Sequence, residues 1–267
     1  KLSYLKPHSP CDPPEPYFSM YAPDDLPPPV KNEHEIEKFP RQVKESYDIW
    51  SQMDEDRTLK HRAQYYGCIS LLDEQIGRVL QKLEDMGIYD NTLIVLTSDH
   101  GDMMCDHHLQ QKGYFFEPSV KVPLIFSGPG VPKGKVVEEN VSQIDLFPTL
   151  MDYCDLAMPE HRDPWGKRIY TDTADSDAIS LMPYFQGTEP VNPDRIIISE
   201  NAIHGQRIML KKHDTKINYY VNEDAEDEIE YFDLRDDPDE LNNHLGAFSV
   251  DDMEPDMKQA LETVLQK

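Results

Sequence analysis

The sequence predicts an α/β protein, in which a layered sheet carries helices on both faces and a small antiparallel α+β subdomain follows. Two observations predict the layered part: helical spacing of apolar residues gives way to an apolar strand, and a second strand and helix follow. The third observation predicts the subdomain, because short strand-like segments alternate with polar turns near the end of the chain. We therefore divide the chain into a layered domain over 1–186 and a subdomain over 187–267.

The N-terminal segment is dominated by proline. Residues 1–5 have the pattern of a short strand, and nine prolines then lie between Pro7 and Pro29. Proline fixes φ and has no N–H to donate, so neither a helix nor a central strand is expected there. We predict a semi-rigid surface loop, in which residues 10–29 form one wall of a pocket.

The layered domain is predicted from four elements. Apolar residues recur at steps of three and four from Ile69 to Leu83, as on one face of a helix, and Gly87 supplies a stop. The strand over 92–97 has a continuous apolar run, which is typical of a strand covered on both faces. Ser142 can cap the second helix, and Pro148 would bend it. The elements are a helix over 57–86, strands over 92–97 and 122–126, and a helix over 142–154.

The C-terminal subdomain is predicted from four short strands and a final helix. An acidic run over 223–228 separates the last two strands, and it lacks the glycine and the alternating ligands of a calcium-binding EF-hand loop. We interpret this run as a solvated turn. The strands are expected over 195–199, 206–210, 217–221 and 230–232, and the helix over 257–265.

The composition restricts the partners. Lys and Arg total 26 against 51 Asp and Glu, which gives a formal net charge of −25. Such a surface repels nucleic acid and anionic membranes, and no apolar run is long enough for a transmembrane helix. The four cysteines are scattered, so a dense disulfide framework is excluded. The chain opens on Lys1 without an initiator methionine, so we expect an upstream segment and slightly favour a secreted or periplasmic location.

The end of the first apolar strand carries the strongest chemical signal. It runs into Ser98-Asp99-His100-Gly101, and ligands of open α/β sheets gather beyond the carboxyl ends of strands. A carboxylate beside an imidazole suits Ca²⁺, Mn²⁺ or Zn²⁺. The alternative is an aspartate in a turn beside a surface histidine. Further carboxylates and imidazoles follow that would line or brace the site, with one histidine touching the substrate: Asp102, Asp106, His107 and His108.

Two further side chains suit an anionic substrate. Lys112 lies in a loop flanked by glycine and aromatic residues, where an ammonium group can clamp a sulfate or phosphate oxygen. His8 lies between Pro7 and Pro10, which fix the backbone around an imidazole able to act as general acid or hydrogen-bond donor. The alternatives are a solvated loop lysine and a surface histidine in a proline-rich loop.

Together these segments resemble the sulfatase family, within the alkaline-phosphatase-like superfamily. The resemblance keeps the order and spacing of the family's motifs over nearly the whole chain. One departure is Cys105, which stands where the family has glycine. The matching segments are Lys6-Pro7-His8-Ser9-Pro10 (K-P-H-x-P), Asp73–Gly77 (D-x-x-I/V-G), Ser98–Gly101 (S-D-H/N-G), Asp106-His107 (G-E/D-H), Lys112, Val122–Leu124 (V-P-L), Gln143–Leu150 (D-L/I-x-P-T-L) and Tyr231–Asn243 (Y-D-L-x-x-D-P-x-E-x-x-N).

The resemblance implies a mixed layered sheet and hydrolysis of sulfate esters with the help of one divalent metal ion. Asp99 and His100 would supply two of the metal ligands, with Ca²⁺ favoured over Mn²⁺ and Zn²⁺. Lys112 would stabilise charge on the sulfate, and His8 would contact the sulfate and protonate the leaving oxygen. We assign three more residues to substrate binding: Lys6, His107 and His108.

The nucleophile of the family is a formylglycine, made from Cys or Ser in a C/S-x-P/A-x-R motif, and this motif is absent from the chain. Cys11 begins a similar segment, but Glu15 stands where arginine is required, so we interpret Cys11 as a decoy. The family places the nucleophile and a pair of metal-binding aspartates in its N-terminal half. We therefore expect this chain to be the C-terminal portion of a longer enzyme, to need that N-terminal half as its partner, and to be inactive alone.

Three alternatives remain open. A phosphonate monoester or phosphodiester hydrolase of the same superfamily fits an Asp-His rather than Asp-Asn metal pair. A two-metal phosphodiesterase would need further Asp and His ligands. A non-catalytic remnant that keeps the fold fits the absence of the nucleophile motif.

Overall fold

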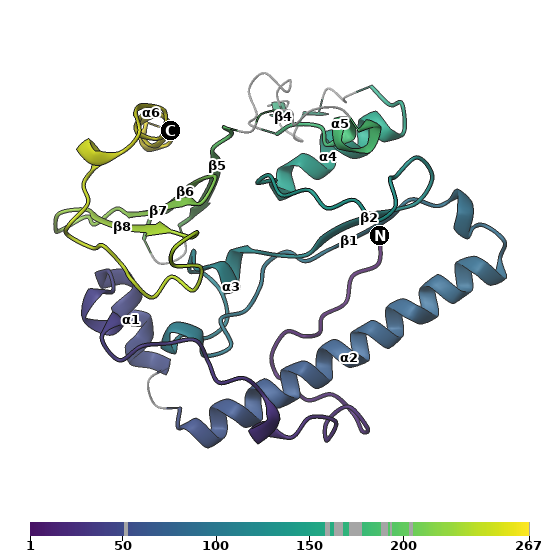
Figure 1. Ribbon diagram of the computed structural model, residues 1–267, viewed down its shortest axis with the longest axis horizontal. Helices are drawn as coiled ribbons and strands as arrows, with labels where there is room; N and C mark the ends of the chain where they lie inside the picture. The colour runs from purple at the N-terminus through teal and green to yellow at the C-terminus, as the bar shows by residue number, and fades with distance from the viewer. Residues whose placement is uncertain are drawn as a thin grey trace.

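The two-stranded sheet at the centre of the molecule and the four-stranded C-terminal sheet lie side by side (Figure 1). A computed structural model describes residues 1–50, 53–157, 161–162, 168–170, 178–187, 192, 194–202 and 205–266. In the view of Figure 1 the two-stranded sheet β1–β2 crosses the centre, the long helix α2 runs diagonally beneath it, and the four-stranded sheet β5–β8 lies to the left, with α6 above it. The division at residues 186 and 187 stays a prediction.

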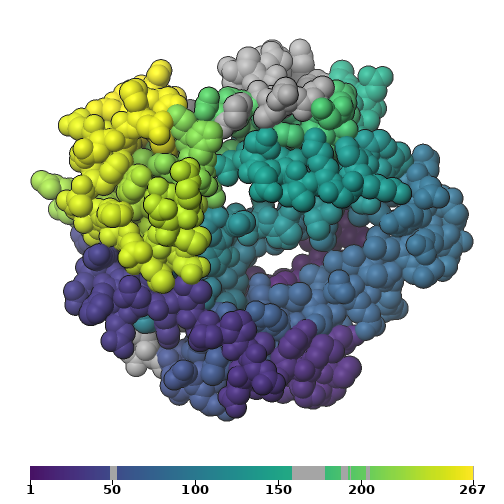
Figure 2. Space-filling view, in the orientation of Figure 1, coloured from purple at the N-terminus to yellow at the C-terminus, as the bar shows by residue number. Residues whose placement is uncertain are grey.

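The predicted long helix is confirmed, as α2 spans Glu55–Asp85. Asp54 caps its first turn by accepting a hydrogen bond of 2.8 Å from Arg57 N. Its apolar row is only half-buried, and Ile69 is 43% exposed. Figure 2 shows openings between α2 and the central layer. No helix in the described part of the chain is both long and apolar enough to cross a membrane.

The two central strands pair antiparallel, β1 over Ile94–Thr97 and β2 over Leu124–Ser127. The prediction that the strand over 92–97 is covered on both faces is wrong for this chain, because Val95 and Leu96 of β1 are half-buried. On the partner strand, Ile125 is 54% exposed. The reason is that, among the described residues, β1 and β2 form a sheet of only two strands, so few neighbours cover them.

The predicted strand over 1–5 is also wrong. These residues pair with no strand among the described residues, and Leu2 and Leu5 are 67% and 78% exposed. The proline-rich loop is confirmed, with a single 3₁₀ turn η1 (Pro23–Asp25) between residues 10 and 29. The loop crosses α2 at Gly67, where a Cβ atom would lie only 2.3 Å from Tyr17 O, so the close approach requires glycine.

The helix expected over 142–154 consists of two pieces. A 3₁₀ turn comes first and is closed by a capping box in which Ser142 N donates to Asp145 Oδ2 at 2.8 Å. Pro148 lies in the first turn of the following helix and does not bend it, since a missing N–H needs no partner there. The remaining short elements are α1 (Arg41–Trp50), α3 (Glu117–Val120), α4 (Leu146–Tyr153), α5 (Met182–Gln186), β3 (His161–Arg162), β4 (Arg168–Tyr170), η2 (Glu35–Lys38), η3 (Tyr89–Asn91), η4 (Asp106–His108), η5 (Gln143–Asp145) and η7 (Val250–Asp252).

The antiparallel C-terminal sheet is confirmed, with each predicted strand end shifted by one or two residues. The expected acidic turn lies between its last two strands and is largely exposed. Helix α6 packs on the sheet, where Met257 and Leu261 are buried with Ile208 and Leu210. The elements, in spatial order, are β5 (Ile197–Asn201), β6 (Arg207–Lys212), β7 (Thr215–Tyr220) and β8 (Glu228–Asp233), with α6 over Pro255–Leu265.

A second core joins the C-terminal sheet to the segment that carries the predicted site. Buried ion pairs lie beside this core: Lys216 is fully buried, and its Nζ lies 3.0 Å from Glu117 Oε1 and 2.7 Å from Glu240 Oε1. The subdomain is thus packed against the segment before and after Lys112. The core consists of Phe39, Val43, Met103, Leu109, Tyr114, Phe116, Tyr220 and Phe232.

Candidate active site

The end of β1 presents a carboxylate and an imidazole together. The Asp99 side chain is 86% exposed, and its Oδ2 lies 3.7 Å from His100 Nε2. His100 Nδ1 lies 2.7 Å from Gly101 O, and since a carbonyl oxygen only accepts, Nδ1 carries the proton. In the neutral ring Nε2 then carries the lone pair beside the carboxylate, as a metal-binding histidine requires.

Neighbouring backbone fixes this pair in place. Gly101 N donates to Ser119 O at 2.8 Å, and a Cβ atom at Gly101 would lie 2.0 Å from Pro118 O. Gln143 Nε2 donates to Asp99 O at 3.2 Å. Slight burial opposes ionisation of Asp99, but the positive charge of His100 in its protonated form and hydrogen bonds from His100 N and Ser98 Oγ to the carboxylate outweigh it and lower the pKa of Asp99. The donor set therefore fits a divalent cation, which binds ionised carboxylate and neutral imidazole.

This pair supplies two ligands, fewer than such an ion takes. No group of three or more His, Cys, Asp or Glu side chains that could hold a metal is found among the described residues. The assignment of Asp99 and His100 to one side of a metal site stays a prediction.

The fold brings His8 and Lys112 into contact, the two residues for which the sequence analysis predicts binding of an anionic substrate. Lys112 Nζ lies 3.0 Å from His8 Nε2. His8 Nδ1 lies 2.7 Å from Ser9 O and so carries the ring proton, which leaves Nε2 as the acceptor for the lysine ammonium group. Both side chains are exposed, so a substrate can reach them.

Lys6 braces the loop that carries this histidine. Its ammonium group forms an ion pair with Asp12 and a hydrogen bond to Pro10 O. The charge of Lys6 is therefore shared with a carboxylate of its own loop. The predicted role of Lys6 in substrate binding remains a prediction.

The thiol of Cys11 is unsuited to nucleophilic chemistry. It is 6% exposed, its Sγ lies 3.6 Å from Pro7 O, and burial raises its pKa to about 11. This environment supports the interpretation of Cys11 as a decoy. All four cysteines of the chain are free thiols.

The two histidines before Lys112 share one buried carboxylate. His107 Nδ1 lies 2.9 Å from Glu35 Oε2, and His108 Nε2 lies 3.4 Å from Glu35 Oε1. The His107 ring is 1% exposed and stacks on Phe116 at a centroid distance of 4.1 Å. This placement gives His107 a bracing function. The sequence did not indicate Glu35, because its partners lie more than seventy residues away along the chain.

Asp106 also braces the same loop. Its Oδ1 accepts hydrogen bonds from Val30 N at 2.8 Å and from Arg62 Nη1 at 3.1 Å. Cys105, at the position where the family has glycine, adopts φ 73°, in the left-handed region that glycine populates most readily. The backbone at Cys105 thus has a conformation that glycine would adopt without strain.

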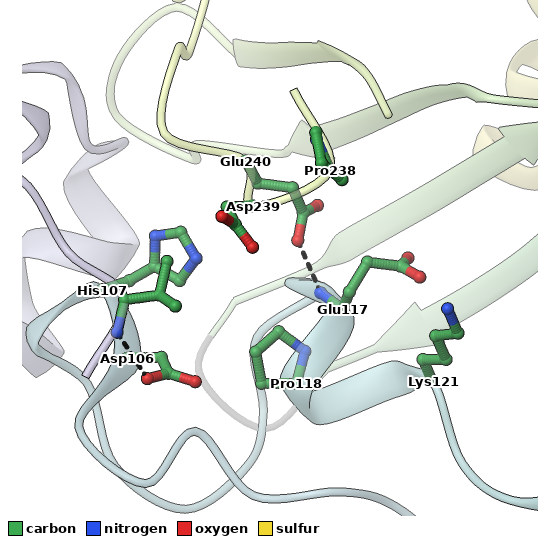
Figure 3. Close-up of a pocket in the computed structure, with 9 residues that line it drawn as sticks. Asp106, His107, Glu117, Pro118, Lys121, Pro238, Asp239 and Glu240 are labelled. Atoms are coloured by element: carbon green, nitrogen blue, oxygen red, sulfur yellow. Dashed lines mark hydrogen bonds between the residues drawn. The ribbon is translucent and has the colours of Figure 1, made fainter. Parts of the chain in front are cut away.

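A cavity of about 280 Å³ lies between this loop, α3 and the turn over 237–240 (Figure 3). Glu117 and Glu240 line it and are both paired with Lys216, and Glu117 N donates to Glu240 Oε2 at 2.6 Å. The lining residues do not include His8, Lys112, Asp99 or His100. The candidate site residues therefore lie outside this cavity, whose two glutamates are paired with Lys216.

Comparison with known proteins shows the family to which the chain is similar. The Sulfatase family profile matches residues 2–156. The chain is 32% identical over 252 residues to an arylsulfatase of Clostridium perfringens, and the aligned segment covers 92% of this chain and 49% of the relative. It is 33% identical over 189 residues to a choline-sulfatase of Rhizobium meliloti, with 71% and 34% covered.

Solved structures of other proteins share the fold of this chain. The phosphonate monoester hydrolase of Agrobacterium radiobacter superposes with a TM-score of 0.78 at 29% identity, over 98% of this chain and 55% of that one. A 2-O glycosaminoglycan sulfatase superposes with a TM-score of 0.68 at 22% identity and shows the fold alone. The chain spans about half the length of the arylsulfatase and of the hydrolase.

Proposed function

Since this chain belongs to the sulfatase family and has its α/β, alkaline-phosphatase-like fold, we propose that it forms part of the active site of an enzyme that hydrolyses sulfate esters. The observation that carries the proposal is the 3.0 Å contact between Lys112 Nζ and His8 Nε2. Two exposed groups, distant in sequence, meet there in a geometry suited to one anionic group.

The two groups have different roles. The Lys112 ammonium pairs with a sulfate oxygen and stabilises the negative charge that grows in the transition state. His8 is neutral in the observed contact, because its Nε2 accepts from Lys112. When the sulfate draws Lys112 toward itself, the exposed Nε2 is free to take up a proton from the solvent, and His8 then gives this proton to the leaving oxygen.

Asp99 and His100 would hold one side of a divalent metal ion, for which Ca²⁺ is favoured. The ion would supply Lewis-acid polarisation of the ester oxygens. We propose that the N-terminal half of the enzyme supplies the remaining ligands and a formylglycine nucleophile, so that this chain alone is inactive. Lys6 and His108 are retained as proposed contacts of the small anionic substrate, and His107 as a residue that supports them. A secreted or periplasmic location also remains a proposal.

A phosphonate monoester hydrolase is the second candidate. It is favoured by the similarity to the Agrobacterium radiobacter enzyme of that name and by the Asp99-His100 pair. Phosphonate and sulfate esters both present charged tetrahedral oxygens to the same lysine and histidine. The two candidates therefore differ in the preferred central atom and not in the roles of the residues.

One assay tests both candidates. The full-length enzyme is given an aryl sulfate and the matching aryl phosphonate monoester, and kcat/KM is compared. A preference for the sulfate supports the first candidate, and a preference for the phosphonate supports the second. Lys112→Ala should lower kcat/KM for the preferred substrate on the order of 100-fold, as loss of an oxyanion donor does. Lys133→Ala, which removes another exposed charge elsewhere, serves as the control. A loss no greater than that of the control would refute the role of Lys112.

A further inference from the structure

The loop over 103–111, which leads directly into Lys112, has a strained backbone. Non-glycine residues rarely adopt positive φ, because this backbone conformation is strained for a residue with a Cβ atom. Strain of this kind persists only where surrounding contacts over-determine the conformation. The residues with positive φ in this loop are Met104 (45°), Cys105 (73°), His107 (52°), His108 (57°) and Gln111 (63°).

The carboxylate of Asp102 joins the two ends of this loop, and we call this junction the neck of the loop. Asp102 Oδ1 accepts hydrogen bonds from Met104 N and from Gln111 N, each at 3.0 Å. Met103 N also donates to Gln111 O at 2.8 Å. Met103 and Gln111, the first and last residues of the loop, are thus tied to each other, and Asp102 Oδ1 joins Gln111 to Met104.

Two other contacts hold the body of the loop. Arg62 Nη1 donates to Met104 O at 2.8 Å. The Glu35 carboxylate contacts the imidazole rings of His107 and His108. These contacts fix the fold of the loop, but they are remote from the point where Lys112 leaves it. The contacts at the neck act on Gln111, the residue before Lys112. On the other side of Lys112, Gly113 O accepts hydrogen bonds from Arg207 Nη1 at 2.8 Å and from Asn201 Nδ2 at 3.3 Å.

We propose that Asp102 is a positioning residue for Lys112. By holding Gln111 N it sets the backbone from which the lysine side chain extends, and so the 3.0 Å contact of Lys112 Nζ with His8 Nε2. Asp102 acts through Lys112 and not on the substrate. The inference rests on the proposed role of Lys112 in binding the anionic group.

A double-mutant cycle in the full-length enzyme tests this. Asp102→Ala frees both backbone N–H groups and should lower kcat/KM by about 10- to 100-fold, since a displacement of about 1 Å can cost that much. The double variant D102A/K112A should be no slower than K112A, because Asp102 then has nothing left to position. Asp102→Asn keeps an oxygen that can accept both bonds and should retain most of the activity.

A matched control separates positioning from a general loss of stability. Asp252 also accepts a hydrogen bond from a backbone amide, Ser249 N at 2.9 Å, in an exposed turn of the subdomain. Asp252→Ala should leave kcat/KM unchanged. If D102A does not fold, Asp102→Glu is used, which keeps the charge and moves the oxygens by one methylene. D102E should lower kcat/KM, and D102E/K112A should match K112A.

The outcomes distinguish this inference from the proposed function. If K112A has full activity, the proposed function fails. If K112A is impaired but D102A and D102E behave like the native enzyme, or their losses multiply with that of K112A, the positioning role is overturned while the role of Lys112 stands. D102N as slow as D102A would also overturn it, because the negative charge and not the clamp would then be responsible.

Discussion

Lys112 Nζ and His8 Nε2 lie 3.0 Å apart, although 104 positions separate the two residues in the chain. The contact defines protonation as well as distance. His8 donates from Nδ1 to Ser9 O and accepts at Nε2, so the charge of the pair lies on the lysine. A substrate anion that displaces this contact would free both groups for their proposed roles.

Loss of His8 should depend on the leaving group. If the imidazole protonates the leaving oxygen, His8→Ala should slow an ester of a strongly basic alcohol by about 100-fold or more and an ester of an acidic phenol much less. Plots of log kcat against leaving-group pKa, measured for the native and H8A enzymes, check this. K112A should lower both substrates to a similar degree. Equal losses in H8A would contradict the general-acid role.

Removal of either predicted metal ligand should remove metal and activity together. Asp99→Ala and His100→Ala should weaken metal binding by more than the roughly 10- to 100-fold typical of residues that only support a ligand. Metal content of the purified full-length enzyme, measured by elemental analysis, is the readout. Asp90→Ala, in the exposed turn before β1, is the control. Native metal content in both D99A and H100A would rule out the assignment.

Gly101 should be intolerant of even one added methyl group. A Cβ atom there would lie 2.0 Å from Pro118 O, so Gly101→Ala must displace α3 and should destabilise the fold by at least about 2 kcal/mol. Gly77→Ala is the matched control. No atom of the described residues lies within 4 Å of a Cβ at Gly77, which is inside α2, so alanine should stabilise by about 0.5–1 kcal/mol. Denaturant unfolding compares the two, and similar losses would contradict the close contact.

Stability should fall as the pH rises toward neutrality, because of Glu230. Burial raises the pKa of this carboxyl to about 7, against 4.5 for an ordinary glutamate. The folded form therefore holds a proton between those values that the unfolded chain releases. The resulting stability is fully present below about pH 4.5 and is lost as the pH rises through 7, by at most about 3 kcal/mol.

Glu230→Gln should remove much of this dependence. Glu230 Oε2 accepts from Tyr220 OH at 2.6 Å and from Asn218 Nδ2 at 3.1 Å, and an amide oxygen can accept the same bonds without a charge. Free energies of unfolding at pH 5 and pH 8 give the slope for each variant. Glu226→Gln, in the exposed acidic turn, should keep the native slope. A native slope in E230Q would mean that another group is responsible.

Local patterns in the sequence predicted the elements but not their surroundings. The helical period identified α2, and the alternation of short apolar segments with turns identified β5–β8, because these signals lie within one segment. The strand expected over 1–5 is absent, and β1 is only half-buried. Both errors concern neighbours, since an apolar segment becomes a covered strand only when other strands and helices lie against it.

The sequence by itself determined the family, the α/β class and the identity of the candidate groups, Asp99, His100, His8 and Lys112, because motif residues and periodicity can be recognised along the chain. Their assigned roles stay predictions. Only the tertiary structure decided which groups meet. It joined His8 to Lys112, placed His107 in the core on Glu35, and closed the loop neck at Asp102. These relationships depend on backbone paths through a strained loop and on contacts between distant segments, which no local pattern encodes.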